Sequence, residues 1–182
     1  ERLVGSEMCI RDRIPISQAD AKYKRYIGNG APKHFLSWSN NLTWRNFDLS
    51  VFFRGTFGFD VFNMRKYGMG LQGCGTDNVL RSAYLEDKNI RTGGGVISSY
   101  FLEDGSFIKL ENVTLGYNFT PKNRKLLDNM RIYLSAKNLF TLTGYSGNDP
   151  EVSTRNSILT PGFDWSPYPR SFNMSVGLNV TF

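Results

Sequence analysis

The chain has 182 residues, of which 22 are Lys or Arg and 16 are Asp or Glu, so its formal net charge is +6. This small positive excess is not clustered and does not indicate a nucleic-acid-binding protein. Two cysteines and one histidine are too few for a disulfide framework or a zinc site, and no metal or cofactor is expected. The longest aliphatic or aromatic runs have three residues, as at 51–53, far fewer than the roughly 18 residues of a membrane-spanning helix.

The first residues are set apart from the rest of the chain. Residues 1–13 show neither helical nor strand periodicity. They resemble the translation of sequencing-adapter DNA, with an ordinary loop as the alternative, and we predict that they are non-native. Residues 14–34 are predicted to be an incoming loop.

Apolar and polar residues alternate along several long segments of the remaining chain. The last segment, from Arg170 to Phe182, alternates without exception, and a period of two is the signature of a strand with two unlike faces. A segment that begins at Phe107 changes phase partway, and a bulge near Glu111 and Asn112 would restore a continuous apolar face. The pattern predicts five strands, at 35–44, 47–57, 107–119, 130–142 and 170–182.

The two faces of these strands differ in charge. Outside the 107–119 strand, the apolar faces carry no charged residue. The residues expected to face lipid are Trp38, Leu42, Trp44, Phe47, Leu49, Val51, Phe53, Ile132, Leu134, Phe140, Phe172, Met174, Val176, Leu178 and Val180. The polar faces carry four charged residues that are expected to face a lumen: Asp48, Arg54, Arg131 and Lys137. Alternation alone also fits a soluble β-sandwich.

Strand length and connections favour a membrane barrel. Globular strands have a mode of about 5–6 residues, whereas the predicted strands reach the roughly 9–11 residues that cross a bilayer. Their connections alternate between short turns and long loops at 58–106 and 143–169, as in outer-membrane barrels. Five strands cannot close such a barrel, which needs at least about 8. The sequence therefore predicts an all-β, antiparallel up-and-down meander that forms a curved open sheet, the C-terminal part of a larger barrel.

Several segments carry a family resemblance. They are 27–33 (IGNGAPK), 46–53 (NFDLSVFF), 107–117 (FIKLENVTLGY), 136–141 (AKNLFT), 149–151 (DPE) and the final strand that ends at Phe182. Together, over roughly Ile27 to Phe182, they resemble the SusC/RagA-type TonB-dependent outer-membrane transporters of Bacteroidota. The resemblance implies a roughly 22-stranded outer-membrane β-barrel and an N-terminal plug that this chain does not contain.

The resemblance also implies partners. They are outer-membrane lipid, a SusD-like lipoprotein that covers a captured glycan or peptide, and TonB, which contacts the missing N-terminal part. Phe182 matches the C-terminal aromatic residue that the barrel-assembly machinery recognises in this class. The expected function is that of the C-terminal barrel segment of an importer of glycans or other large nutrients. No catalytic motif is present, so an enzyme is not expected.

The two long loops hold the candidate contact residues. Residues 78–87 predict a short helix with Asp77 as its N-cap, which either packs within the loop or faces a partner. The loop at 143–169 carries aromatic and acidic side chains that suit a sugar or a cation. These candidate ligand contacts are Tyr145, Asp149, Glu151, Trp165 and Tyr168. Anchoring of the aromatic residues at the membrane interface is the alternative.

Two other functions remain open on the sequence. A soluble β-sandwich carbohydrate-binding module would bury the apolar strand faces against a second sheet. A passive porin would share the barrel wall but would lack the plug.

Overall fold

The computed structural model describes residues 2–6, 24–69, 78, 80–81, 99–121, 128–151, 161–165 and 167–181. They fall into two compact units. The long-strand unit consists of Phe35–Thr56, Phe107–Thr143 and Arg170–Phe182, and the loop unit of Glu1–His34, Phe57–Ser106 and Gly144–Pro169. Within the described residues, no helix has the length and apolar character needed to cross a membrane.

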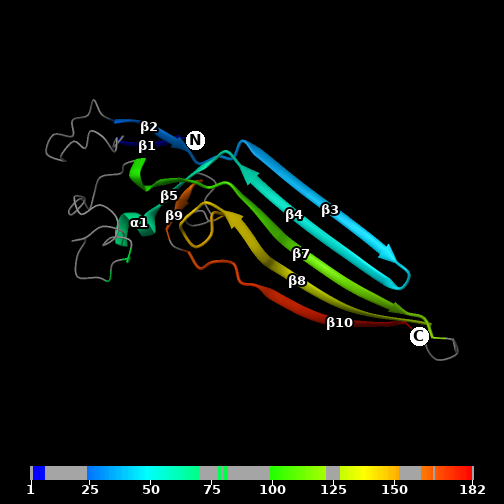
Figure 1. The fold of residues 1–182 in the computed structure, drawn as a ribbon. Helices are drawn as coiled ribbons and strands as arrows, with labels where there is room; N and C mark the ends of the chain where they lie inside the picture. Colours follow the sequence, from blue (N-terminus) through cyan, green and yellow to red (C-terminus); the bar gives the residue numbers. More distant parts are fainter. Residues whose placement is uncertain are drawn as a thin grey trace. The chain divides into compact units, whose positions relative to one another are not determined.

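The long strands form one five-stranded sheet in the order β10-β8-β7-β4-β3 (Figure 1). The strands are β3 (His34–Trp44), β4 (Phe47–Phe57), β7 (Phe107–Phe119), β8 (Asn129–Thr143) and β10 (Asn173–Thr181). Long strands that follow one another along the chain are neighbours in the sheet, and β4–β7, β7–β8 and β8–β10 pair antiparallel. The predicted open, antiparallel meander of five long strands is confirmed.

The last strand begins later than predicted. Alternation suggested a start at Arg170, but β10 starts at Asn173, which is paired with Lys137 of β8. The next residue of β8, Asn138, has a φ of 54°, and its side-chain amide donates to the carbonyl of Ser171 at 3.1 Å. This left-handed residue interrupts the regular ladder, and the pairing of β10 with β8 therefore begins at Asn173.

The predicted bulge in β7 is present. Phe52 and Phe53 of β4 are adjacent, yet they pair with Asn112 and Leu110 of β7, which leaves Glu111 as an extra residue. The register between β7 and β8 shifts at the same place. One inserted residue reverses the side-chain phase of a strand, and the bulge therefore keeps the apolar residues of β7 on one face.

The register places apolar residues in rows across four strands. One row contains Leu49, Leu115, Leu134 and Val176, in the order β4, β7, β8 and β10. The adjacent rows are Phe47, Tyr117, Ile132 and Leu178 on one side, and Val51, Val113, Ala136 and Met174 on the other. Cross-strand pairs of this kind are the unit of sheet stabilisation, and here they form a continuous apolar face.

The rows of the opposite face are polar and contain two glycines with close neighbours. One row contains Asp48, Gly116, Tyr133 and Gly177. A Cβ atom at Gly116 would lie 2.5 Å from Oδ1 of Asp48, and a Cβ at Gly177 would overlap the ring of Tyr133. Glycine inside a strand often marks such close approaches. The two glycines therefore leave room for larger side chains from neighbouring strands.

The loop unit contains a second, smaller sheet and its own core. Its strands are β5 (Asp60–Asn63), β6 (Leu102–Asp104) and β9 (Phe163–Asp164), with β5 in the centre. The helix α1 (Met64–Met69) follows β5, and a 3₁₀ turn, Ser99–Phe101, precedes β6. Phe62 and Phe101 are buried, and partly buried Tyr67 and Phe163 pack against them. Their ring centroids lie 5.2–5.9 Å apart, within the range of aromatic pairs.

The N-terminal part of the loop unit differs from the prediction. Residues 14–34 were expected to form a loop, but they contain β2 (Lys24–Asn29), which pairs antiparallel with β1 (Arg2–Ser6). The prediction was wrong at β2 because backbone pairing, not apolar alternation, defines this strand. The 58–106 loop contains a short helix, as the fold prediction expected, but this helix lies at 64–69, where none was predicted. The helix predicted at 78–87 lies almost entirely outside the described residues.

We predict that Gly116→Val destabilises the long-strand unit through Asp48. The new side chain would displace the Asp48 carboxylate, and overpacking of this kind costs about 1–3 kcal/mol. In an Asp48→Ala background the same substitution should cost about 1 kcal/mol less. Urea titration of the four variants in detergent micelles measures the free energies of unfolding. Equal costs in both backgrounds would show that Asp48 does not occupy the space above Gly116.

Candidate functional site

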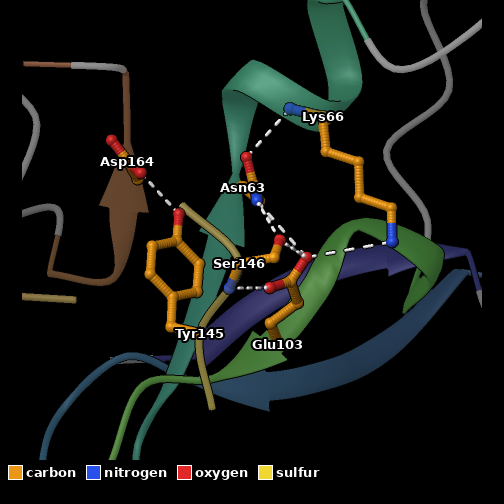
Figure 2. Close-up of polar contacts among 6 residues, drawn as sticks. All are labelled: Asn63, Lys66, Glu103, Tyr145, Ser146 and Asp164. Atoms are coloured by element: carbon orange, nitrogen blue, oxygen red, sulfur yellow. Dashed lines mark hydrogen bonds and ion pairs between the residues drawn. The ribbon is translucent and has the colours of Figure 1, made fainter. Parts of the chain in front are cut away.

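A polar cluster joins three segments of the loop unit. This Glu103 cluster consists of Asn63 at the end of β5, Lys66 in α1, Glu103 in β6, and Ser146 after β8 (Figure 2). The Asn63 side-chain oxygen accepts a hydrogen bond from the backbone N–H of Lys66 at 2.8 Å. Asn63 is therefore the N-cap of α1, and it fixes where the helix begins.

Glu103 is the centre of this cluster. Its Oε2 accepts a hydrogen bond from the backbone N–H of Ser146 at 2.8 Å, and its Oε1 accepts from the Ser146 hydroxyl at 2.8 Å. The amide of Asn63 donates to Oε1 at 3.3 Å and to the Ser146 hydroxyl at 3.1 Å. The Lys66 ammonium lies 3.8 Å from Oε1. One carboxylate thus ties the segment after β8 to β5 and α1.

The Glu103 cluster forms one side of a pocket of about 620 Å³. Beyond the cluster, the pocket is lined by Arg65, Leu80, Arg81, Asp104 and Gly144. Ligand pockets in proteins usually measure about 300–1,000 Å³, so this volume admits a small molecule or a unit of a larger chain. Three cations and two carboxylates surround it, which gives a polar site of mixed charge.

A buried pair lies next to the cluster. The Tyr145 hydroxyl donates a hydrogen bond of 2.5 Å to Oδ2 of Asp164, which follows Phe163 in β9 (Figure 2). Both side chains are buried. Burial, together with this hydrogen bond, raises the pKa of Tyr145 well above its usual value. The phenol therefore stays protonated and links the segment after β8 to β9.

The 27–33 segment has a backbone role in the loop unit. The backbone N–H of Asn29 donates to Oδ2 of Asp60 at 2.9 Å, and its own side chain accepts from the N–H of Ala31 at 3.1 Å. A Cβ atom at Gly30 would lie 2.7 Å from the carbonyl carbon of Pro161. The segment thus packs too closely on its neighbours for a side chain at Gly30.

Three of the four predicted lumen-facing residues form ion pairs on the polar face. Arg131 binds Asp48 through two nitrogens, with NH2 at 2.5 Å and Nε at 3.3 Å, and Asn118 donates to the same carboxylate at 2.9 Å. Arg54 pairs with Glu111, the bulge residue, at 2.8 Å. Lys137 is exposed on the same face. Partly exposed pairs contribute little stability each.

The apolar face of the long-strand unit is exposed. The exposed fraction is 39% for Leu134, 58% for Leu178 and 72% for Val176. Near the β3–β4 turn, the rings of Trp44 and Phe47 lie 6.4 Å apart and those of Phe47 and Tyr117 lie 4.8 Å apart. No described residue forms a second layer over these side chains.

The five candidate ligand contacts lie in different environments. Tyr145 and Asp149 are buried, and Asp149 accepts a hydrogen bond from the backbone N–H of Glu151 at 3.0 Å. Trp165 and Tyr168 are exposed, at 66% and 90%. None of the five lines the pocket, and their role as ligand contacts stays a prediction.

Sequence reasoning did not single out the residues of the Glu103 cluster, nor Asp164 or Glu111 as partners. Their contacts join positions far apart in the chain, such as Asn63 and Ser146, and no local sequence pattern predicts these contacts. A signal did exist for Gly116 and Gly177, because each interrupts a strand on its polar face. Asn63 also has the residue type of an N-cap.

The chain is similar to known proteins in sequence and in fold. No protein-family model matches the chain. TonB-dependent receptor P3 of Formosa agariphila is 31% identical over 188 residues, which cover 92% of this chain and 18% of the relative. TonB-dependent receptor SusC of Bacteroides thetaiotaomicron is 28% identical over 79% of this chain and 14% of its own length. The chain thus spans about a fifth or less of the curated relatives that it matches.

Solved structures share the fold of the chain. The structure of the RagAB peptide transporter matches 100% of this chain and 22% of its own, with a TM-score of 0.77 and 20% identity. The RagAB peptide importer in the open-open state matches with a TM-score of 0.73 and 23% identity, over 98% of this chain and 20% of that chain. In sequence and in fold, the chain corresponds to the C-terminal barrel segment of SusC/RagA-type TonB-dependent outer-membrane transporters.

Proposed function

We propose that this chain forms wall strands and external loops of a TonB-dependent importer of glycans, peptides or other large nutrients in the outer membrane. In this proposal the long-strand unit is one sector of the barrel, and strands outside the chain complete it. A plug and a TonB-contacting segment, also outside the chain, couple the barrel to the proton gradient. A SusD-like lipoprotein covers the external loops.

One observation carries the proposal. Four strands align their apolar residues in register on a face that the described residues leave exposed. A membrane supplies the missing cover for such a face, because hydrocarbon requires apolar side chains and closed backbone pairing. The residues that we propose to face lipid are those of the predicted set, from Trp38 to Val180.

The same observation weighs against a soluble β-sandwich. That architecture seals the inner face of each sheet beneath the other sheet, whereas Leu42 and Leu178 are each 58% exposed. A passive porin would share the wall. The match to TonB-dependent receptors over most of the chain favours the importer.

The proposed barrel also assigns roles to the charged residues of the polar face, to Phe182 and to two exposed aromatic residues. Asp48, Arg54, Arg131 and Lys137 would face the lumen, where water and the plug tolerate charge. Phe182 would be the terminal residue that the assembly machinery recognises. The exposed Trp165 and Tyr168 would lie at the membrane interface or contact a ligand.

Tryptophan fluorescence tests the proposed orientation in lipid. The chain has three tryptophans, of which Trp38 and Trp44 are on the apolar face and Trp165 is in the loop unit. In vesicles with brominated lipids, a variant that retains only Trp38 should be quenched strongly, and one that retains only Trp44 should be quenched best by bromines near the headgroups. A variant that retains only Trp165 should be quenched least. Equal quenching of all three, or none, would contradict the lipid-facing assignment.

A charge placed on each face of β10 gives a matched comparison. Val176→Arg should lower the free energy of unfolding in lipid vesicles by about 2–4 kcal/mol, the cost of a cation near the bilayer centre. Ser175→Arg, one residue away on the polar face, should change it by less than about 1 kcal/mol. Guanidinium titration monitored by fluorescence measures both. A larger loss for Ser175→Arg would reverse the assignment of the two faces.

The importer and the porin differ in their energy requirement. In cells that express the longer protein carrying this chain, uptake of its nutrient should stop when a protonophore collapses the proton gradient. Uptake of a small solute through an unrelated porin is the control and should continue. Continued nutrient uptake after collapse would support the porin.

A further inference from the structure

We propose that the pocket beside the Glu103 cluster binds a sugar acid, that is, a sugar unit that carries a carboxylate or sulfate group. The inference rests on the proposed importer function, since it assigns a substrate class to the external loops. The charged groups around the pocket differ in how far they are already engaged within the protein.

The carboxylates of the pocket are largely engaged within the protein. Glu103 accepts hydrogen bonds from the backbone and hydroxyl of Ser146 and from Asn63, and it lies near the Lys66 ammonium. Oδ1 of Asp104 accepts from the backbone N–H of Ser106 at 2.9 Å and from its hydroxyl at 2.6 Å. The other carboxylate oxygen of Asp104, Oδ2, can accept a further hydrogen bond.

The guanidinium groups retain donors. Arg65 uses one nitrogen, NH1, on the side-chain oxygen of Asn148 at 2.7 Å, and a guanidinium has five N–H donors. Arg81 is exposed, and among the described residues it has no partner. A backbone hydrogen bond of 2.7 Å from Leu80 to the carbonyl of Met69 places Arg81 next to the end of α1. Among the described lining residues, the charge without a partner is therefore positive and suits an oxyanion, which guanidinium groups bind in fork geometry.

The other groups that line the pocket suit the hydroxyl groups of a ligand rather than a flat apolar surface on it. Asp104 presents an acceptor and Ser146 a hydroxyl. Among the described residues, none that lines the pocket is aromatic, so this lining offers a neutral sugar ring no aromatic face for stacking. A ligand that carries both an oxyanion and hydroxyl groups would bind the guanidinium groups through the first, and Asp104 and Ser146 through the second.

Gly144 provides a way to close the pocket without disturbing the fold. A Cβ atom at Gly144 would meet nothing within 4 Å, and its φ is not in the left-handed region. Gly144→Leu should therefore occupy pocket space at little cost to folding. Gly68, in α1, is equally open but does not line the pocket, so Gly68→Leu is the matched control.

Calorimetric titration of the full chain in zwitterionic micelles tests the proposal with four probes. Glucuronate and glucose 6-sulfate should bind. Glucose, which has hydroxyl groups but no charge, and sn-glycerol 3-phosphate, which represents a lipid headgroup, should bind at least about tenfold more weakly, a difference of about 1.4 kcal/mol. Tighter binding of glycerol phosphate would assign the site to lipid headgroups, and equal binding of glucose would remove the role of the oxyanion. Either result overturns the proposal.

Substitutions inside and outside the pocket test whether glucuronate binds there. Arg81→Gln should weaken glucuronate binding about tenfold, the effect of losing one charged hydrogen bond, and Gly144→Leu should abolish it. Lys33→Gln, an exposed cation of the loop unit outside the pocket, and Gly68→Leu should bind like the unaltered chain. Lipid quenching of Trp38 in each variant reports the wall independently. Normal quenching without glucuronate binding would refute the sugar-acid site alone, whereas loss of quenching in the unaltered chain would refute the importer.

Discussion

The register of backbone pairing in the five-stranded sheet is the constraint on which the other features depend. Side chains alternate with a period of two, so a slip of one residue between neighbouring strands would move every apolar side chain of a strand to the polar face. The observed pairing prevents this across four strands: Leu49, Leu115, Leu134 and Val176 share one row. Because β7 reverses its phase, the apolar residues before and after Glu111 lie on one face only with the bulge at that residue.

The polar face shows how one sheet accommodates large and charged side chains without a second layer. Gly116 leaves space above β7, and Asp48 from β4 meets Arg131 from β8 across it. The Arg131 guanidinium also lies 5.3 Å from the ring of Tyr133, and that ring covers Gly177. Small and large residues thus alternate across the strands. Glu111, displaced by the bulge, pairs with Arg54, so the irregular residue also contributes to the polar face.

The loop unit has a core and polar contacts of its own that stabilise its structure. Aromatic residues around Phe62 form a core. The buried hydrogen bond from Tyr145 to Asp164 and the partly exposed hydrogen bonds of Glu103 join segments that enter from three different strands. Polar networks favour a defined arrangement only when every buried member is satisfied. In the proposed importer, a ligand site in this unit would lose less conformational entropy on binding, because its segments are already ordered.

The sequence by itself determined the long strands, their antiparallel order, the bulge and the division into an apolar and a polar face. These features follow from the local alternation of apolar and polar residues, which continues for many residues, as from Asn173 to Thr181. The family resemblance rests on the same segments. The sequence did not determine β2 or the small sheet of the loop unit, since strands as short as Phe163–Asp164 show no period. Nor did it determine the Glu103 cluster, the pocket beside it or the Tyr145–Asp164 pair. Those depend on contacts between residues from 19 to 83 positions apart, and only the tertiary structure brings such residues within hydrogen-bonding distance.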